Sequence, residues 1–346
     1  MHMEKIFIEN CCEILDSMRI PITAENREKG PYPYYGANGI QDYVADYIFN
    51  DELVLLAEDG GNFGSKDKPI AYRVSGKCWV NNHAHVLKPK SGLNVDYLCY
   101  SLMFYKIDGM VNGATRQKLT QAAMRKMKIP FIPMDEQLNV VHKLNKITKI
   151  KEQREKELKL LDDIIRARFV ELTNKEKTVP TRMGDVATYV NGYAFKPTDW
   201  KKKGLPIIRI QNLNDSHALY NYFDGEINEK YRIHKGDVLV SWATHLEAYI
   251  WKGQDAWLNQ HIFKVEFNKM EINKIYFVYS TEEALRQAFK NAHGFKPTME
   301  HIKRSDFENA VIQVPSMELQ NQFADFANQV NKSKVILSKP PFNVII

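Results

Sequence analysis

The sequence predicts an α+β protein with two tandem globular domains, each followed by a long helix. A five-residue signature occurs twice, as Trp79-Val80-Asn81-Asn82-His83 and as Trp257-Leu258-Asn259-Gln260-His261, and the copies are 178 positions apart. Between them lies a stretch of 39 residues, 134–172, that contains no glycine or proline. In each half, short β-type runs and helical segments follow one another without strict alternation, which favours α+β over a doubly wound sheet.

The repeat extends on both sides of the signature, as a duplicated domain requires. Five further pairs of segments keep the same order in the two halves: 30–35 with 204–209, 51–56 with 236–241, 97–98 with 276–277, 113–116 with 294–297, and 132–137 with 315–320. The offset stays between 174 and 185 residues. Solenoid repeats run at roughly 20 to 50 residues, so this period has the length of a whole domain.

The first domain is expected to cover residues 1–133. The runs Val54-Leu55-Leu56 and Cys78-Trp79-Val80 are typical of short strands, and the clusters at 36–39 and 58–62 are typical of turns. We therefore expect a mixed globule of strands and helices in this half.

Residues 134–173 are expected to form one long helix. Ten positions along it step by alternating four and three residues, which is the pattern of a coiled-coil seam. Seven of them are apolar, namely Val140, Leu144, Ile147, Leu158, Leu161, Ile165 and Leu172. At 1.5 Å per residue the helix would be roughly 58 Å long, which is longer than a small domain is wide. A long amphipathic helix packed on the nearest core is the alternative interpretation.

The second half repeats this arrangement after a polar linker at 174–181. Its expected parts are a second domain at 182–315, with strands near 206–210, 237–240 and 263–267, a C-terminal helix at 316–338 and a tail at 339–346. The C-terminal helix carries Phe323, Phe326 and Val330 on one face. Since Pro340 and Pro341 follow it, we expect this helix to have little more than half the length of the first.

The composition is that of a globular protein that stays inside the cell. Of 346 residues, 44% are hydrophobic and 26% are charged, and no stretch approaches the ~20 apolar residues of a membrane span. The N-terminus does not have the pattern of a secretion signal, and the four cysteines predict reduced thiols, so we expect a cytoplasmic protein with no membrane contact. Five of the six net positive charges lie outside the central helix, which suits a polyanion bound to the domains.

No catalytic or metal-binding constellation stands out in the sequence. The glycines of 60–66 lack the spacing of a phosphate-binding loop and predict an ordinary turn. The segment 339–342 is similar to the Asn-Pro-Pro-aromatic tetrapeptide of amino-methyltransferases, but Lys339 replaces the amide that holds the target amino group. His83 and His85 share a face of an expected strand, yet no Cys or carboxylate cluster completes a metal site, so we expect ordinary polar contacts there.

The remaining polar and aromatic clusters suit contact with DNA. Asn and Gln bond the edge of adenine, Arg and Lys bond guanine or phosphate, and aromatic side chains pack against sugars and thymine methyls. The candidates in the first domain are Tyr32, Tyr34, Tyr35, Asn38, Gln41, Asn81, Asn82, His83, Arg116, Gln117 and Lys118. Those in the second domain are Arg209, Gln211, Asn212, Trp242, Thr244, His245, Asn259, Gln260, His261 and Lys296. For the repeated signature, a buried tryptophan followed by polar residues that fix a turn is the alternative.

On these residues the chain resembles the specificity subunit of type I restriction–modification enzymes. The resemblance is carried by the string 30–40, the segments 55–61, 79–83 and 113–118, and the helix entry 133–137, and it covers almost the whole chain. It implies two target-recognition domains that read two parts of a split DNA sequence, and helices that pair as an antiparallel coiled coil. Family members usually carry a second helix as long as the first. Because Pro340 and Pro341 end the second helix here, we expect it to be shorter than in those members.

The resemblance also implies a non-catalytic subunit that works within a complex. The helices would fix the distance between the two half-targets on double-stranded DNA and dock two modification (methyltransferase) subunits, with restriction subunits joining afterwards. No cofactor is expected in this chain, because S-adenosylmethionine, ATP and Mg²⁺ would belong to the partner subunits. The helices also offer a surface for self-association.

Two other classes of function are left open by the sequence. One is an enzyme, a methyltransferase or a nuclease fused to a recognition module, which the purified chain would reveal by methylating or cleaving DNA. The other is a helical assembly adaptor without DNA binding, for which neither domain would bind any duplex in a random-sequence selection.

Overall fold

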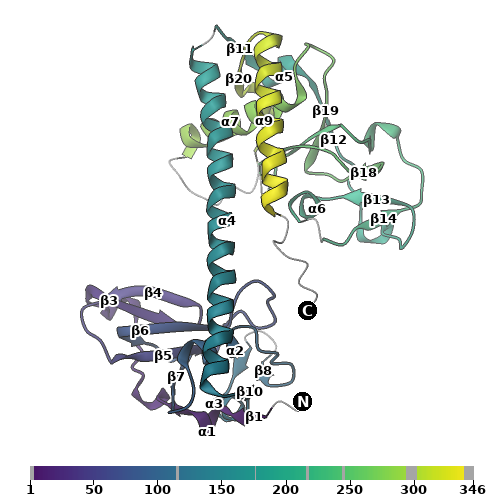
Figure 1. The fold of residues 1–346 in the computed structure, drawn as a ribbon. Helices are drawn as coiled ribbons and strands as arrows, with labels where there is room; N and C mark the ends of the chain where they lie inside the picture. The colour runs from purple at the N-terminus through teal and green to yellow at the C-terminus, as the bar shows by residue number, and fades with distance from the viewer. Residues whose placement is uncertain are drawn as a thin grey trace. The chain divides into compact units, whose positions relative to one another are not determined.

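The computed structural model describes residues 4–113, 117–175, 177–215, 218–243, 246–293 and 302–338 (Figure 1). Contacts divide the chain into two compact units, Met1–Glu152 and Gln153–Ile346. Each unit has its own sheets and its own hydrophobic core. Among the described residues, no helix combines the length and the apolar character needed to cross a membrane.

The first unit is built around a six-stranded mixed sheet (Figure 1). Its strands lie in the order β2 (Cys12–Ile14), β7 (Ala84–Pro89), β5 (Phe49–Ala57), β6 (Ala71–Val80), β3 (Lys29–Gly36) and β4 (Gly39–Val44). The pair β3–β6 is parallel, and the other neighbours are antiparallel. Smaller elements are β1 (Lys5–Phe7) with β10 (Lys128–Pro130), β8 (Val111–Asn112) with β9 (Lys118–Leu119), α1 (Ile8–Cys11), α2 (Val95–Met103) and α3 (Gln121–Arg125).

Strand β5 gives the sheet a core on both faces. Successive side chains of a strand point to opposite sides. Val54 and Leu56 therefore join the hydrophobic cluster that includes residues of α2, whereas Leu53 and Leu55 join a second cluster on the other face. All four side chains are fully buried. The apolar run that the sequence predicts as a strand is thus the central part of this sheet.

The second unit repeats the pairing of the first. One sheet has the order β12 (Thr188–Asn191), β19 (Ile262–Glu266), β16 (Val238–Ser241), β17 (Ala248–Ile250), and the other β14 (Asn221–Phe223), β13 (Leu205–Ile208), β18 (Ala256–Leu258), β15 (Arg232–Ile233). The strands β13 and β18 are parallel, as β3 and β6 are. Tyr34 pairs with Trp79 in the first unit, and Ile207 pairs with Trp257 in the second. The repeated signature therefore marks the same place in two copies of one arrangement.

The predicted linker, residues 174–181, differs from the structure at both ends. Residues 174 and 175 continue the long helix that begins at Met134. Residues 179–181 belong to strand β11 (Val179–Arg182), which pairs antiparallel with β20 (Val311–Val314). Pro180 is tolerated there because β11 is an edge strand of a two-stranded sheet. The remaining short helices of the second unit are α5 (Met183–Val186), α6 (Ile210–Asn214) and α8 (Arg304–Asn309).

Both predicted long helices are present. Helix α4 runs over Met134–Lys175 and has 42 residues, and α9 runs over Met317–Ser338 and has 22. Helix α7 (Lys274–His293) lies beside α9 in the second unit (Figure 1). The lengths agree with the expectation that the second long helix has little more than half the length of the first.

A buried glutamine anchors the start of each long helix. In α4, the Gln137 side chain accepts a hydrogen bond from the Asn94 N–H at 2.8 Å and donates to two backbone carbonyls, at 2.9 and 2.8 Å. In α9, the Gln320 side chain accepts from the Asn273 N–H at 2.9 Å and donates to Pro315 O at 2.9 Å. Asn94 and Asn273 themselves cap the helices α2 and α7. The repeated Met-x-x-Gln entry thus has one structural role in both halves.

The two long helices pair within the second unit. Phe169 of α4 lies 5.4 Å from Phe323 of α9 between ring centroids, and Asp162 forms an ion pair of 2.5 Å with Lys334. The pairing is antiparallel, because the later residue of α4 contacts the earlier residue of α9. Ile165 and Leu172 of the predicted seam are buried in the same cluster as Phe323.

The seam differs from the prediction at several positions. Phe169, which the sequence pattern missed, is buried beside Ile165 and Leu172, because a straight α-helix drifts by about 20° per heptad away from a strict seven-residue repeat. Near the start of α4 the buried apolar residue is Val141, whereas the predicted Ile147 is 57% exposed. The other predicted members are half-buried, namely Val140, Leu144, Leu158, Leu161, Phe326 and Val330.

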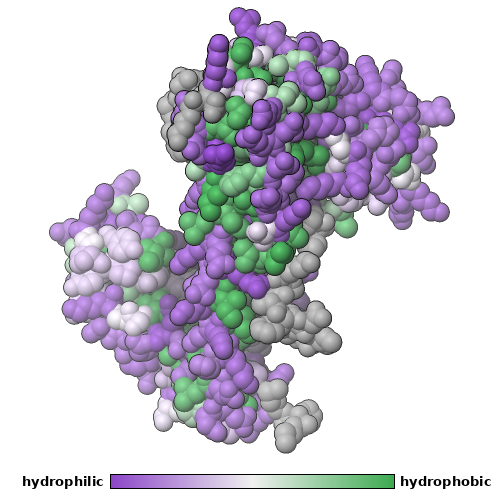
Figure 2. All heavy atoms as spheres, turned by 45° about the horizontal axis from the view of Figure 1, so that its top comes forward, coloured by the Kyte–Doolittle hydropathy of each residue, from purple (hydrophilic) through white to green (hydrophobic). Residues whose placement is uncertain are grey.

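Several apolar side chains of α4 and α9 are exposed. Leu160 and Ile164 of α4 are 60% and 47% exposed, and Val335 and Ile336 of α9 are 58% and 68% exposed. Figure 2 shows hydrophobic side chains on the surface along α4. Helices with such faces favour contact with other protein surfaces.

Candidate nucleic-acid interface

Three segments far apart in the sequence meet in the first unit. They are the turn after β5, the signature turn before β7, and the segment that contains β9. The Glu58 N–H donates to His83 O at 2.9 Å, the Leu119 N–H donates to Glu58 O at 2.7 Å, and the Gly60 N–H donates to Gln117 O at 3.3 Å. Backbone hydrogen bonds therefore hold these loops in a fixed register.

Two predicted contact residues are attached to the turn after β5. The Asn38 amide donates to Gly60 O at 3.0 Å, and His83 Nδ1 lies 2.6 Å from an Asp59 carboxylate oxygen. Asn38 is exposed and His83 is half-buried, so both side chains reach the surface at this place.

Two other predicted contact residues have structural roles. Asn81 is only 3% exposed, and its side chain donates to Gln41 Oε1 at 3.0 Å and accepts the His83 N–H at 2.8 Å. Tyr34 is 1% exposed, and its hydroxyl accepts the Ile22 N–H at 3.1 Å. Burial leaves neither side chain open to DNA, which differs from the prediction. Asn81 instead fixes the signature turn, as the alternative interpretation holds.

The other candidates of the first domain lie at or near the surface. Tyr32 and Tyr35 are half-buried against Tyr47 and Tyr72, with ring centroids 5.0 and 5.7 Å apart. The exposed candidates are Gln41, Asn82, Gln117 and Lys118. Arg116 lies outside the described residues.

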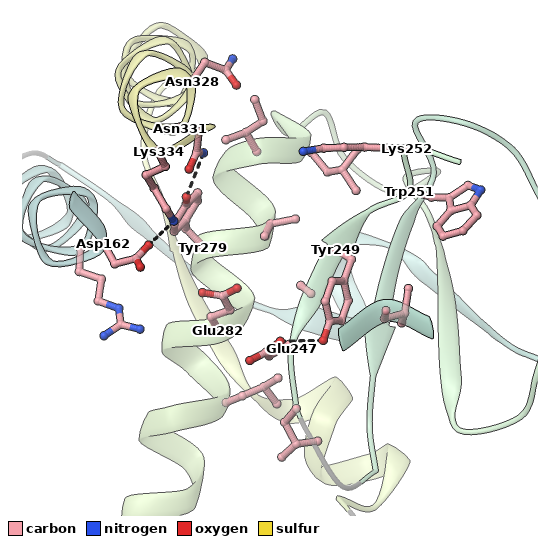
Figure 3. A pocket seen from close by; sticks show the side chains of 18 of the residues that line it. Asp162, Glu247, Tyr249, Trp251, Lys252, Tyr279, Glu282, Asn328, Asn331 and Lys334 are labelled. Atoms are coloured by element: carbon pink, nitrogen blue, oxygen red, sulfur yellow. Dashed lines mark hydrogen bonds and ion pairs between the residues drawn. The ribbon is translucent and has the colours of Figure 1, made fainter. Parts of the chain in front are cut away.

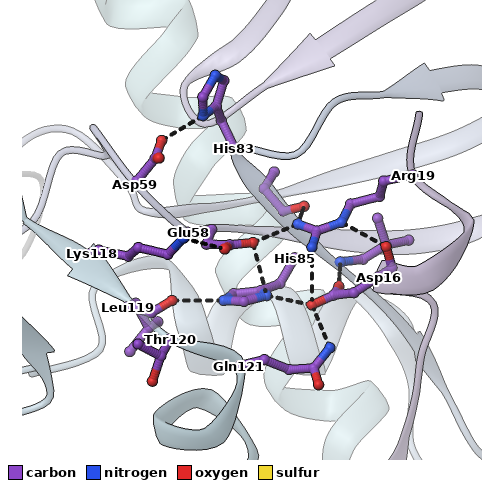
Figure 4. Close-up of polar contacts among 12 residues, drawn as sticks. Asp16, Arg19, Glu58, Asp59, His83, His85, Lys118, Leu119, Thr120 and Gln121 are labelled. Carbon is purple, nitrogen blue, oxygen red and sulfur yellow. Dashed lines mark hydrogen bonds and ion pairs between the residues drawn. The ribbon is translucent and has the colours of Figure 1, made fainter. Parts of the chain in front are cut away.

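A group of polar side chains around the buried Asp16, Glu58 and His85, here called the His85 cluster, underlies these loops (Figure 4). Its members are Asp16, Arg19, Glu58, His85, Lys118 and Gln121. His85 is fully buried, with Nδ1 2.6 Å from Asp16 Oδ2 and Nε2 2.9 Å from Leu119 O. The Glu58 carboxylate accepts a hydrogen bond from Arg19 Nη1 at 2.6 Å and forms an ion pair with Lys118 Nζ at 3.0 Å.

Asp16 is ionised within this cluster. Burial raises the pKa of the Asp16 carboxyl, but the hydrogen bond and the positive charge of His85, with bonds from the Gln121 amide and the Val86 N–H, outweigh burial and lower the pKa below its ordinary value. Gln121 and Val86 donate to the two carboxylate oxygens at 2.9 Å each. The carboxylate is therefore held by donors on both oxygens.

Asp16, Glu58 and His85 have the residue types of a metal site, and their potential ligand atoms lie within 4.8 Å of one another. However, both ring nitrogens of His85 already face oxygen atoms, and Arg19 and Lys118 hold the Glu58 carboxylate. A cation would have to displace these bonds and would meet two positive side chains. The arrangement therefore suits an internal ionic network. The sequence analysis did not predict this network, because Asp16 and His85 are 69 residues apart.

In the second unit, predicted contact residues line one pocket of about 390 Å³. Its lining residues are Arg209, Ile210, Gln211, Asn214, Asn259, Gln260 and His261. Five of these seven residues are predicted DNA contacts, from two segments about 50 residues apart. Strand β13 leads into α6 on one side, and strand β18 leads into the signature turn on the other. Guanidinium and amide groups in a concave site are suited to base edges.

The signature turn of the second unit has a demanding backbone. His261 has a φ of 74°, a left-handed value that is uncommon for residues other than glycine. A Cβ on Gly192 would lie 2.0 Å from Asn259 O, so only glycine permits these two backbone segments to approach so closely. The Gln260 N–H donates to Tyr193 O at 2.8 Å, and the Asn259 N–H donates to Ile208 O at 3.1 Å. The turn is thereby fixed from two sides.

Other candidates of the second domain divide into structural and undescribed residues. Asn212 is 6% exposed, and its side chain accepts the Arg209 N–H at 3.1 Å, so it caps α6 in place of facing DNA. Trp242 is half-buried and stacks on Phe263, with ring centroids 5.8 Å apart. Thr244, His245 and Lys296 lie outside the described residues.

Trp200 is a residue of this region that the sequence reasoning missed. It is 40% exposed, and the guanidinium carbon of Arg209 lies 5.2 Å from its ring centroid. A cation held over an indole face is both oriented and partly desolvated. Trp200 therefore positions Arg209 beside the pocket. No repeated motif marks it, because the repeat has no tryptophan at this place in the first half.

A larger groove of about 1260 Å³ lies in the second unit between α4, α7, α9 and the strand β17 (Figure 3). Asp162 pairs with Lys334 at one side, and the Tyr249 hydroxyl donates to Glu247 at 2.6 Å at the other. Burial, together with the charge of Glu247, raises the pKa of Glu282 to about 7. The groove contains few of the predicted DNA contacts, since Asn212 alone among them lines it.

When the chain is compared with known protein families, one family model matches it twice. The model described as the type I restriction modification DNA specificity domain matches residues 2–160 and 175–340. A Haemophilus influenzae sequence named as a type I restriction enzyme specificity subunit is 37% identical over 141 residues, which are 41% of this chain and 36% of that protein. The Escherichia coli EcoBI specificity subunit is 28% identical over 165 residues, which are 46% of this chain and 34% of that protein. The aligned part thus spans about a third of the length of these relatives.

A solved structure shows the same fold. It comes from work on complex assembly and conformational transition of the type I R-M system, and it superposes with a TM-score of 0.52 at 13% identity. The match covers 96% of this chain and 91% of that chain. The predicted arrangement of two tandem domains with long helices is therefore confirmed at the level of fold.

Proposed function

Because the chain belongs to the type I restriction–modification DNA specificity family, we propose that it is the subunit that selects the DNA sequence for such a complex. Each of its two domains reads one part of a split target on double-stranded DNA. The proposed domains are residues 1–133 and 179–315, joined by the helix α4 (Met134–Lys175), with the helix α9 (Met317–Ser338) and the segment 339–346 after the second domain.

The observation that carries the proposal is that the specificity domain occurs once in each half of the chain. The pocket of the second unit supports it, because Arg209, Gln211, Asn259 and Gln260 place guanidinium and amide groups side by side. Such groups distinguish bases by their hydrogen-bond patterns in the major groove. A protein that reads two parts of a sequence needs two such surfaces.

The partners are proposed from the family and from the exposed helical faces. Two modification subunits dock on α4 and α9, where Ile147, Leu160 and Val335 are exposed, and restriction subunits join them. The chain itself is non-catalytic and holds no cofactor. S-adenosylmethionine, ATP and Mg²⁺ belong to the partner subunits, which carry out methylation and cleavage.

Single-molecule sequencing of methylated DNA tests this function. Cells with the gene should carry a bipartite adenine-methylation motif that is lost when the gene is deleted and returns with a plasmid copy. A methylome that does not change on deletion would contradict the proposal. The purified chain should bind the motif duplex with an affinity that falls steeply as salt rises, and should neither methylate nor cleave it.

A further inference from the structure

The His85 cluster contacts three segments of the first unit, namely the turn after β5, the strand β7 and the segment that contains β9 (Figure 4). Glu58 begins the turn to which Asn38 and His83 are attached, through Gly60 and Asp59. Lys118 is an exposed candidate contact, and its ammonium group bonds Glu58. The exposed ends of these side chains are therefore positioned from one buried centre.

Both ring nitrogens of His85 face hydrogen-bond acceptors at this centre. A backbone carbonyl only accepts hydrogen bonds, so Nε2 donates to Leu119 O. The Asp16 carboxylate also only accepts, so Nδ1 donates to it. Both ring nitrogens then carry a proton, and Nδ1 also lies 3.6 Å from Glu58 Oε2. The imidazolium links two carboxylates and the strand β9.

The second unit fills the equivalent place with aromatic rings. His85 pairs with Leu56 in the strands β7 and β5, and Phe263 pairs with Val240 in β19 and β16. The Glu58 N–H donates to His83 O, and the Trp242 N–H donates to His261 O in the same way. Trp242 and Phe263 therefore stand where the first unit has Glu58 and His85. Their stacked rings, 5.8 Å apart, replace an ionic contact by an apolar one.

We propose that His85 is a positioning residue for DNA recognition by the first domain. Its charge holds the turn at Glu58 and the strand β9 in one register, so that Asn38, His83 and Lys118 present a fixed pattern to the duplex. In the second domain the packing of Trp242 on Phe263 holds the equivalent segments in register. This inference rests on the proposed function, because it concerns which half of the target depends on the cluster.

The decisive variant replaces the ionic pair of the first unit by the aromatic pair of the second unit. It carries Glu58→Trp together with His85→Phe. The complete modification complex is assayed on duplexes that carry the wild-type motif or single-base changes in either half. Discrimination in the half read by the first domain should fall roughly tenfold to hundredfold, and discrimination in the other half should not change. Hydrogen exchange of the strands β5 and β7 reports whether the first unit is folded. A folded double variant that keeps full discrimination in both halves overturns the proposal.

Asp16→Asn provides a second variant of nearly unchanged size, for the case that the double variant does not fold. It should also weaken discrimination in the first half alone, and unchanged discrimination overturns the proposal. A purely structural role would not require charge, so ¹⁵N NMR of the His85 ring in the wild-type protein should show two protonated nitrogens, and a neutral ring overturns the proposal. A wild-type complex without any bipartite motif would instead overturn the proposed function.

Discussion

The buried glutamine at the start of each long helix gives a prediction whose magnitude follows from the structure. Gln137 is fully buried and makes three hydrogen bonds, and Gln320 is 1% exposed and makes two. A buried hydrogen bond contributes about 1 kcal/mol on average. Replacement by methionine, which has a similar volume, should lower the free energy of unfolding by about 3 kcal/mol at Gln137 and about 2 kcal/mol at Gln320.

Denaturant unfolding and hydrogen exchange of the full chain measure the effect. Gln137→Met should increase exchange in residues 94–103, whose helix cap it supports, and Gln320→Met should increase exchange at the start of α7. The exposed neighbour Glu136 provides the matched control, because Glu136→Met should change the free energy of unfolding by no more than about 0.5 kcal/mol. If Gln137→Met is as mild as this control, the anchoring role is wrong.

Three further predictions concern the second unit and the helices. The raised pKa of Glu282, about 7 against an ordinary 4.5, means that the folded state resists its ionisation, so stability from this group is lost as pH rises from about 4.5 to 7. Glu282→Gln should therefore stabilise the second unit by up to about 3 kcal/mol at pH 8 and by little at pH 4, and equal effects in thermal unfolding at both pH values would contradict this. Trp200→Ala should weaken binding of the motif duplex roughly tenfold by releasing Arg209, and an unchanged Kd in a titration would refute the stacking role. Ile147→Glu should leave unfolding unchanged within about 0.5 kcal/mol but reduce co-purification of modification subunits, and full co-purification would argue against docking on this face of α4.

The elements that the sequence predicts well are those with local signals. The start of α4 follows Pro133, and the start of α9 follows Pro315 by two residues. A few neighbouring residues therefore determine where each helix begins. The apolar run at 53–56 is buried on both faces, and this is typical of a central strand. The repeat then carries each of these interpretations from one half to the other.

The direction of single side chains could not be predicted in the same way. Tyr34, Asn81 and Asn212 have residue types suited to DNA, but strand register and turn geometry point them into the protein. The His85 cluster joins residues from 16 to 121, which are brought together by the pairing of β2, β5 and β7 and by the backbone hydrogen bond between Leu119 and Glu58. By contrast, Asn259 and Gln260 follow a strand that the repeat had already located, and they line a pocket as a contact residue should.

The central claim is that each domain reads its own part of the DNA target. It is tested most directly by single-molecule sequencing of methylated DNA from cells whose only copy of the gene carries Gln260→Ala. The account predicts that one half of the bipartite motif becomes relaxed or altered while the other half and the spacing stay the same. A change in both halves, or a motif identical to the wild type, would contradict separate reading by two domains.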